Sequence, residues 1–149
     1  LTLPKHAVCA SSIIKNFKTT YDESTLGIDR KIISYYIQQR GIEKALIIDA
    51  GSFITFDEIR EGMHHGGAIF LGLKNYLKSY PKFSAQLPML AEIEDGNSNT
   101  VQAISTAYRS YLSMIKNHVS KYKDYQLFIT GGDAYHFSDL GEIQENLIP

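Results

Sequence analysis

The order of apolar and polar positions predicts a chain that alternates between strands and helices. A short β-like run over His6–Ala10 comes first, and polar residues then dominate positions 11–25. From Asp29, apolar residues recur at the spacing of one helix face, and Gly41 follows Arg40 as a typical helix terminator. The apolar members of this face are Ile32, Ile33, Tyr36 and Ile37. We therefore expect one amphipathic helix from Asp29 to Arg40.

Three short strands are expected next. Ala45–Ile48 is wholly apolar, as in a strand that is buried on both faces, whereas Phe53–Ile59 alternates between apolar and polar positions. The sequence Arg60-Glu61-Gly62 is typical of a tight hairpin turn, and Met63–Phe70 then forms the returning strand. The pattern thus predicts a meander of three strands.

Beyond Gly72 the apolar spacing becomes helical. One helix face consists of Leu73, Tyr76, Leu77 and Tyr80, and we expect Pro81 to end this helix. Asn99 is a favourable N-cap for a second helix, whose apolar stripe runs from Val101 to Val119. The pattern therefore predicts two consecutive helices after the meander.

A last buried strand at Gln126–Thr130 ends at Gly131-Gly132, and a short helix is expected after it. Three meandering strands, two helices and a returning strand predict an α/β fold, in which helices flank a mixed sheet in the ribonuclease-H-like arrangement. A domain boundary near Gly41 would separate residues 1–41 from residues 42–149.

The composition narrows the class of protein. The 149 residues are 44% hydrophobic and 21% charged, which suits one soluble domain or slightly more. The formal net charge of -1 argues against a nucleic-acid partner. Cys9 is the only cysteine, which excludes a disulfide framework and indicates a reduced, cytoplasmic setting. No apolar run approaches the ~20 residues that span a bilayer, and the first residues lack the pattern of a secretory signal, so no membrane partner is expected.

Asp49-Ala50-Gly51-Ser52 is the first segment that suggests chemistry. A carboxylate at the end of a buried strand is costly unless it meets a cation or several donors. Gly51 allows a tight turn with exposed N–H groups, and Ser52 adds a hydroxyl, so the segment can hold a phosphate chain with its metal ion. An ordinary Asp-x-Gly turn between two strands is the alternative.

Gly27-Ile28-Asp29-Arg30 is the second such segment. Gly27 permits close approach of a ligand, Asp29 can accept a proton, and Arg30 can bind a carboxylate. The alternative is a first-turn acid that complements the helix dipole and pairs with Arg30.

Glycine pairs and two histidines form a third group. Gly66-Gly67 within a strand indicates a bulge or a close backbone contact. Gly131-Gly132-Asp133-Ala134 either lets an adenine lie against bare backbone or is a simple strand-to-helix turn. His64 and His65 are neighbours on a strand, so they point to opposite faces and cannot easily share one metal ion.

Taken in order, six segments resemble the type III pantothenate kinase family, also named the Bvg accessory factor family. They are LGIDR (26–30), ALIIDAGSFITFDEI (45–59), GMHHGGAIFLGL (62–73), SAQLP (84–88), NTVQAI (99–104) and FITGGDA (128–134). The resemblance implies an actin-like ATPase fold of two ribonuclease-H-like halves, with residues 1–41 as the tail of the first and residues 42–149 as the second. It also implies transfer of the ATP γ-phosphoryl group to the primary hydroxyl of pantothenate, the first step towards coenzyme A.

The resemblance further implies roles for the residues that match its motifs. Asp29 would be the general base, and the pantothenate pocket would be lined by Tyr21, Gly27, Ile28, Asp29 and Arg30, with Arg30 on the substrate carboxylate. Asp49 would hold a monovalent cation, potassium or ammonium, and Ser52 would touch ATP, which brings Mg²⁺. We expect Asp29 and Asp49 to converge on a single crevice.

Thr100 matches a threonine that reaches the pantothenate of the neighbouring subunit in this family. The resemblance therefore implies a homodimer with shared active sites. The stripe from Val101 to Val119 would serve as a dimer surface, as intramolecular core, or as both.

Some features depart from the family pattern. The family opens with an Asp-x-Gly-Asn-Thr phosphate loop that the printed residues do not contain, so we expect residues 1–149 alone to bind ATP poorly and not to turn over. Leu71 replaces a usual proline, and Thr106 stands where glycine is common. A non-catalytic regulatory protein (an accessory transcription factor or pseudokinase) and another actin-fold sugar or acetate kinase are the alternatives.

Overall fold

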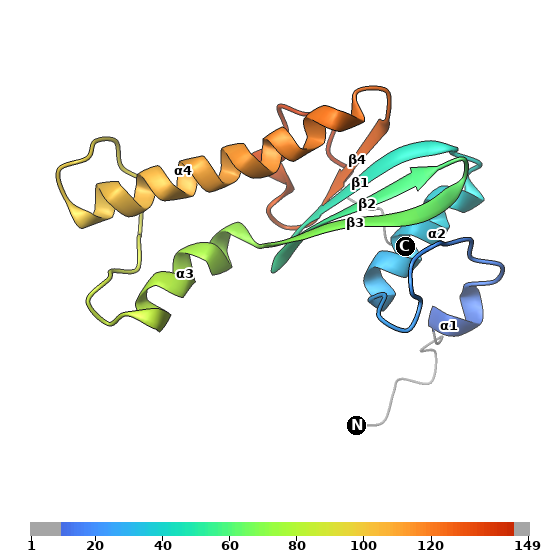
Figure 1. Cartoon of the computed structure of the whole chain (residues 1–149), viewed down its shortest axis with the longest axis horizontal. Coiled ribbons are helices and arrows are strands. Elements are labelled where there is room, and N and C mark those ends of the chain that lie inside the picture. The colour runs from blue at the N-terminus through green and yellow to red at the C-terminus, as the bar shows by residue number, and fades with distance from the viewer. Residues whose placement is uncertain (1–9, 145–149) are drawn as a thin grey trace.

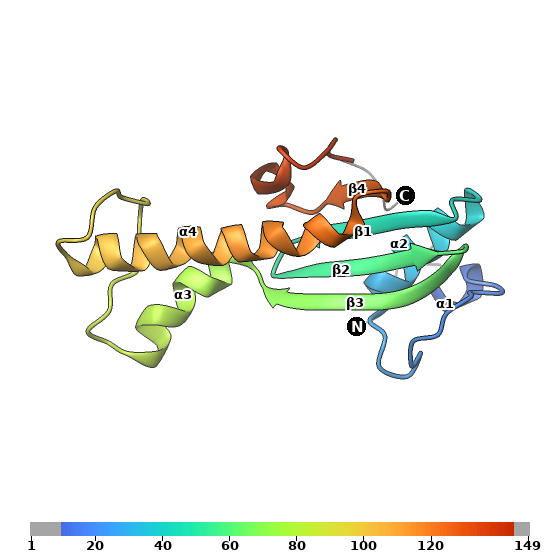
Figure 2. The ribbon, with the colours of Figure 1, turned by 45° about the horizontal axis from the view of Figure 1, so that its top comes forward.

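The computed structural model describes residues 10–144, which form a four-stranded mixed sheet with helices on both faces (Figures 1 and 2). The strands are β1 (Lys44–Ala50), β2 (Phe53–Arg60), β3 (Met63–Leu71) and β4 (Gln126–Thr130). The helices are α1 (Ala10–Ile13), α2 (Ile28–Gln39), α3 (Leu73–Phe83) and α4 (Thr100–His118), with the 3-10 turns η1 (Val119–Tyr122) and η2 (Ala134–Phe137). The strand order is β3-β2-β1-β4, with β1 parallel to β4 and the other pairs antiparallel. The predicted α/β fold is confirmed.

Local sequence signals account for several element ends. Gly41 takes a left-handed φ of +69° directly after α2, where glycine has no Cβ to clash. Glu61 and Gly62 both have positive φ, as the tight turn between β2 and β3 requires. The Asn99 side chain accepts a hydrogen bond from the Gln102 N–H at 2.9 Å and so caps α4. These three predictions are confirmed.

Two expectations about the elements are wrong. Pro81 lies inside α3 rather than at its end, because proline removes only its own N–H, and the Ser84 N–H still reaches the Tyr80 carbonyl at 3.0 Å. The other concerns the start of the chain, where α1 (Ala10–Ile13) opens the polar stretch 11–25, for which the sequence predicts no element. Of the predicted β run His6–Ala10, the residues before Ala10 lie outside the described part of the chain, and Ala10 itself begins α1.

The core has two layers, one on each face of the sheet. One face packs under α4, η1 and η2, and its fully buried members include Leu46, Ile48, Ile54, Phe56, Ile115 and Phe137. The other face packs under α2, through Ile33, Ile37, Ala45, Ile47, Ile59 and Phe128. The apolar stripe predicted for α2 therefore attaches this helix to the sheet of residues 42–144, and the boundary near Gly41 stays a prediction.

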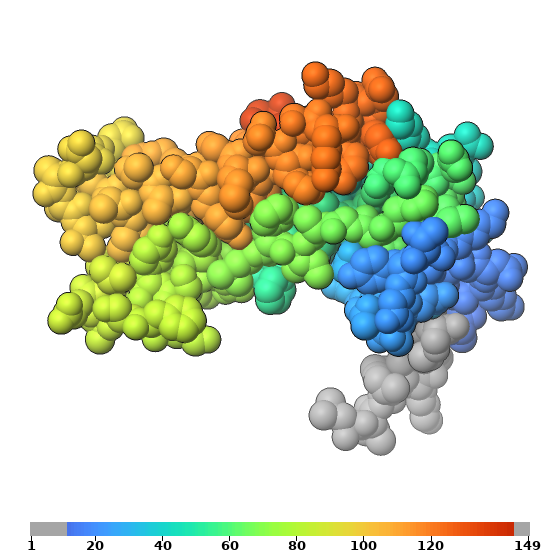
Figure 3. Space-filling model, viewed as in Figure 1, coloured from blue at the N-terminus to red at the C-terminus, as the bar shows by residue number. Residues whose placement is uncertain are grey.

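A helical arm extends beyond the sheet (Figures 1 and 3). It consists of α3 and the first half of α4, and residues 84–99 connect the two helices at its far end. The Tyr76 ring stacks on Tyr111 at a centroid distance of 4.2 Å, and the Tyr111 hydroxyl donates to the Leu71 carbonyl at 2.8 Å. None of the helices within residues 10–144 has the length and apolar character needed to cross a membrane.

Candidate functional site

A pocket of about 600 Å³ lies where the start of α2 meets the end of β1; we call it the acid pocket. Its lining consists of Thr25, Gly27, Asp29, Arg30, Asp49, Gly51, Ser52, Phe53, Thr55 and Ile69. Asp29 and Asp49, twenty positions apart in the sequence, therefore line a single hollow. The expectation that these two acids converge is confirmed.

Asp29 is held at the first turn of α2. Gly27 is the N-cap residue of this helix, and the Asp29 carboxylate accepts a hydrogen bond from the Arg30 N–H at 2.9 Å. A Cβ at position 27 would lie 2.6 Å from Asp29 Oδ1, so only glycine leaves the carboxylate in this place. The capping interpretation of Asp29 is right about its position in the helix, but Asp29 does not pair with the Arg30 guanidinium, which binds Asp57 instead.

Asp49 is the penultimate residue of the buried strand β1, where a carboxylate is costly without a cation. Burial raises the pKa of Asp49, and the negative charges of Asp29 and Asp57 add to this shift. Within residues 10–144 no Lys, Arg or His side chain forms an ion pair with Asp49. A Cβ at Gly131 would lie 2.6 Å from Asp49 Oδ1 and 2.4 Å from the Ala50 carbonyl oxygen. Only glycine therefore lets the backbone at position 131 pass this close to both oxygens, and the Ala50 carbonyl accepts the Asp133 N–H at 2.8 Å.

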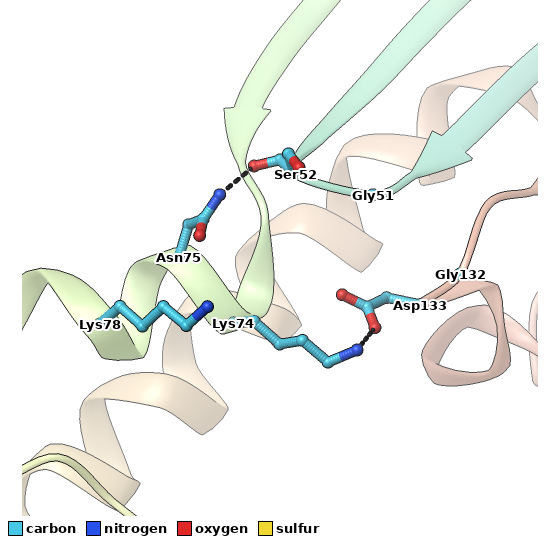
Figure 4. A pocket seen from close by; sticks show the side chains of 7 residues that line it. All are labelled: Gly51, Ser52, Lys74, Asn75, Lys78, Gly132 and Asp133. Carbon is cyan, nitrogen blue, oxygen red and sulfur yellow. Dashed lines mark hydrogen bonds and ion pairs between the residues drawn. The ribbon is translucent and has the colours of Figure 1, made fainter.

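A second pocket, of about 230 Å³, adjoins the first; we call it the lysine pocket (Figure 4). Its lining consists of Gly51, Ser52, Lys74, Asn75, Lys78, Gly132 and Asp133. Lys74 comes from the first turn of α3, and its Nζ lies 2.6 Å from Oδ1 of the buried Asp133. The hydrogen bond to Asp133 raises the pKa of Lys74. The segment Gly131–Ala134 is therefore a turn between β4 and η2, as one of the two alternatives predicts, and its residues Gly132 and Asp133 also line the lysine pocket.

Gly51 and Ser52 belong to both pockets and form the boundary between them. The Asn75 side chain donates to the Ser52 carbonyl at 2.9 Å, and the Gly72 N–H donates to the same carbonyl at 3.0 Å. A Cβ at Gly72 would lie 2.1 Å from the Gly51 carbonyl oxygen, so glycine is needed for this close approach. These contacts hold the β1–β2 turn against the start of α3. The turn thus lies between the two acids of the acid pocket and the two lysines of the lysine pocket.

The structure does not bring all the predicted site residues to this pocket. Ile28 is 51% exposed and does not line either pocket. Tyr21 lies beside the acid pocket, with the Arg30 guanidinium 5.2 Å from its ring centroid. Thr100 is exposed at the start of α4, at the far end of the arm from the sheet (Figure 1). Of the predicted set, Gly27, Asp29, Arg30, Asp49 and Ser52 are therefore the ones that lie together.

Two buried residues next to the pocket were missed by sequence reasoning. Asp57 is 2% exposed and His64 is 0% exposed, and Asp57 Oδ1 lies 2.7 Å from His64 Nε2. Asp57 shares its strand face with Thr55 and Ile59, the latter part of the core under α2. A charged residue at a buried position of an alternating strand needs a polar or charged partner. The position of Asp57 in the alternation of β2 could therefore have identified it from the sequence. His65 is set apart by a register shift in the β2–β3 ladder, and its ring contacts Thr20 instead.

Comparisons with known proteins identify the family. The sequence model of the type III pantothenate kinase family matches residues 2–121, which is most of the chain. The chain belongs to the type III pantothenate kinase family. Among proteins named type III pantothenate kinase, that of Helicobacter hepaticus is 42% identical over 120 residues, with 76% of this chain and 53% of the relative covered. The corresponding protein of Sulfurimonas denitrificans is 35% identical over 120 residues, with 78% and 54% covered.

A crystal structure from Campylobacter jejuni shares the fold. It is described as a Baf family transcriptional activator, and it matches with a TM-score of 0.60 and 31% identity over 88% of this chain and 62% of its own. The chain spans about half the length of the curated relatives it matches. Those relatives are named as kinases, whereas the Campylobacter jejuni structure is described as a transcriptional activator.

Proposed function

We propose that this chain carries the acid pocket of an enzyme that phosphorylates pantothenate with ATP to give 4′-phosphopantothenate, the first step of coenzyme A biosynthesis. The single observation that carries the proposal is the meeting of two pockets at Gly51 and Ser52. One pocket presents two carboxylates, as proton abstraction and cation binding need, and the other presents two lysines, as a phosphate chain needs. Family membership supports the same reaction.

The chemistry follows from these positions. Pantothenate in the acid pocket would place its primary hydroxyl beside Asp29, whose carboxylate takes the proton while the hydroxyl oxygen bonds to the γ-phosphorus. The bond from the γ-phosphorus to the β,γ-bridging oxygen breaks, and ADP leaves with Mg²⁺. Ser52, at the boundary of the pockets, is suited to contact the phosphoryl group in transit. Phosphoryl transfer needs this kind of positioning more than covalent chemistry.

Asp49 suits a monovalent cation, potassium or ammonium. Its carboxylate lacks a cationic side-chain partner within residues 10–144, it lines the acid pocket, and Gly131 places no Cβ against its Oδ1. Such an ion would offset the negative charge that Asp49, Asp29 and the phosphates place in one region.

We place the reaction in the cytoplasm, in keeping with the single Cys9.

Lys74 is expected to bind the phosphates of ATP. Its side chain is 68% exposed and can exchange Asp133 for a phosphate oxygen, so Lys74→Ala should raise the KM for ATP about 3- to 10-fold, as for one exposed charge-assisted contact. The KM for pantothenate should change little. Lys82→Ala, on the same helix but outside the lysine pocket, is the matched control. Equal ATP KM values for the two variants would remove Lys74 from this role.

A homodimer would explain why Thr100 lies far from the acid pocket. The arm that carries Thr100 exposes apolar side chains, among them Phe83 (84%), Met89 (52%) and Ile93 (39%), and large exposed apolar groups favour an interface. We propose that Thr100 completes the pantothenate pocket of a partner subunit.

Mixed dimers test this sharing of sites. Co-expression of Asp29→Asn and Thr100→Ala chains should restore about a quarter of wild-type turnover, because half of the dimers are mixed and each mixed dimer keeps one intact site. Each variant expressed alone should be impaired. Mixed preparations no more active than the average of the two variants would show that Thr100 acts within its own subunit or not at all.

The proposed function itself is tested by product analysis. The full-length protein, supplied with ATP, Mg²⁺, K⁺ and pantothenate, is expected to form phosphopantothenate and ADP in equal amounts, as mass spectrometry and a coupled ADP assay would measure. ATP binding without any pantothenate-dependent product would refute the proposal. The same assay separates the kinase from a regulatory protein.

A further inference from the structure

A buried chain of polar side chains runs from Arg30, which lines the acid pocket, to Asp57 and His64, which the proposed reaction does not use. The Asp57 carboxylate receives Arg30 Nε at 2.9 Å and Arg30 Nη2 at 2.6 Å, which together form a two-pronged ion pair. The same carboxylate receives His64 Nε2 at 2.7 Å. Because an ionised carboxylate only accepts, the hydrogen of this contact belongs to His64 Nε2. Asp57 therefore joins α2, β2 and β3 at one buried point.

The chain continues from His64 to the segment that carries Tyr21. His64 Nδ1 lies 2.9 Å from Thr19 Oγ1, and the Tyr21 N–H donates to the same hydroxyl oxygen at 2.9 Å. Backbone bonds reinforce the contact, since the Thr20 N–H donates to the His64 carbonyl and the His64 N–H donates to the Lys18 carbonyl, both at 3.0 Å. His64 thus ties residues 18–21 to the edge of the sheet.

Two residues at the mouth of the acid pocket depend on this chain for their positions. Arg30 is 7% exposed, and of its guanidinium donors two are fixed by Asp57. Tyr21 lies outside regular secondary structure and packs its ring over Gly66, where a Cβ would come within 2.3 Å of the ring. The Tyr21 ring also faces the Arg30 guanidinium at 5.2 Å. Arg30 and Tyr21 are thereby held against each other and against the sheet.

The electrostatics favour an intact ion pair. Burial alone would raise the pKa of Asp57, but the hydrogen bonds from His64 and Arg30 outweigh it and lower the pKa. Asp57 is therefore ionised whenever the fold is intact near neutral pH. Loss of either partner would leave a buried charge without its full set of donors.

We propose that Asp57 and His64 are positioning residues that fix Arg30 and Tyr21 at the acid pocket and so set its affinity for the carboxylate-bearing hydroxy acid. The inference rests on the proposed function for the identity of that substrate. It assigns no catalytic contact to either residue. It also gives a structural role to His64, which the sequence analysis left without one.

Asp57→Asn in the full-length protein is the first test. The amide offers one acceptor oxygen where the carboxylate offers two, so one donor of Arg30 or His64 loses its partner. We expect the KM for pantothenate to rise about 10- to 100-fold, and the KM for ATP to stay within about twofold. Glu58→Gln is the matched control, since this neighbouring acid points to the opposite sheet face and bonds Tyr125. Equal pantothenate KM values for the two variants would overturn the proposal.

A pair of substitutions at His64 keeps the test decisive if Asp57→Asn fails to fold. His64→Gln retains an N–H near the position of Nε2, whereas His64→Leu retains none. The KM for pantothenate should therefore be lowest in the wild type, higher in His64→Gln and highest in His64→Leu. Identical KM values in the two His64 variants would contradict a role through hydrogen bonding.

Hydrogen exchange separates failure of the inference from failure of the proposed function. The amides of Thr20 and Tyr21 should exchange faster in Asp57→Asn and His64→Leu than in the wild type and Glu58→Gln, whatever the substrate. If the wild type makes no phosphopantothenate but the variants differ in exchange as expected, the kinase function is refuted and the positioning role is supported. Unchanged exchange in all variants would refute the positioning role.

Discussion

Asp29→Asn is expected to lower turnover of the full-length enzyme at least ~10²-fold, the usual scale of a lost general base. Asparagine keeps the size and the acceptor oxygen of the side chain, so it preserves the hydrogen bond from the Arg30 N–H, but it cannot take a proton. Binding of pantothenate should therefore survive. Turnover is measured by ADP release and binding by calorimetric titration.

Glu23→Gln is the control for this substitution, because Glu23 is a nearby exposed acid that pairs with Lys31 outside the pocket. It should leave both turnover and binding near the wild-type values. Turnover retained in Asp29→Asn would remove Asp29 from the role of base. Turnover and binding lost together would show instead that Asp29 holds the substrate.

Asp49→Asn is expected to abolish the dependence of activity on potassium and to lower turnover about 10²-fold, as removal of one electrostatic contact to the reacting charges does. The neutral amide binds a monovalent cation poorly, so the repulsion between Asp29 and the phosphates is no longer offset. Activity is measured in potassium, ammonium and choline salts. A variant that still responds to potassium as the wild type does would place the cation elsewhere.

The same substitution is expected to stabilise the fold when no potassium is present. The pKa of Asp49 is raised above its ordinary 3.8, so the folded state binds this proton more tightly than the unfolded chain does. Stability is therefore lost as the pH rises from about 3.8 through the folded pKa, and Asp49→Asn removes that loss. In choline at pH 7 we therefore expect the Tm of Asp49→Asn to lie above that of the wild type, as thermal unfolding would measure.

Potassium should reduce this difference in Tm, because a cation bound at the wild-type Asp49 carboxylate would stabilise the folded state. The pKa of Asp57 is shifted in the opposite direction, below its ordinary 3.8. The ionised Asp57 therefore stabilises the fold above about pH 3.8, and this stabilisation is lost as the pH falls through the pKa of the folded state. If the Tm of Asp49→Asn in choline is lower than that of the wild type, the ionised Asp49 carboxylate does not destabilise the fold, and this account of Asp49 is wrong.

The elements of the sheet were predictable because their signals are local. The apolar run in β1, the alternation in β2 and the Glu61-Gly62 turn each define a structure within a few residues. Pro81 was misleading because a proline removes only its own N–H, and here α3 continues past it by just two residues, Lys82 and Phe83.

The candidate site was predictable in part. Asp29 and Asp49 stand out in their local segments, and the family motifs assign their roles; the packing of α2 on the sheet brings them together. The pairing of Arg30 with Asp57 joins positions 27 apart, and no local pattern specifies which acid an arginine will meet. The contacts of His64 depend on the register shift between β2 and β3 and on the bridge that Thr19 forms with His64. Tertiary packing sets both of these features, so no local pattern predicts them.

The most direct measurement is a crystal structure of the full-length protein with pantothenate and thallium(I), a potassium substitute with a strong anomalous signal. The account predicts an anomalous peak beside the Asp49 carboxylate and the primary hydroxyl of pantothenate within hydrogen-bond distance of Asp29, both in the acid pocket. Pantothenate bound in another hollow, or with its hydroxyl turned away from Asp29, would contradict it.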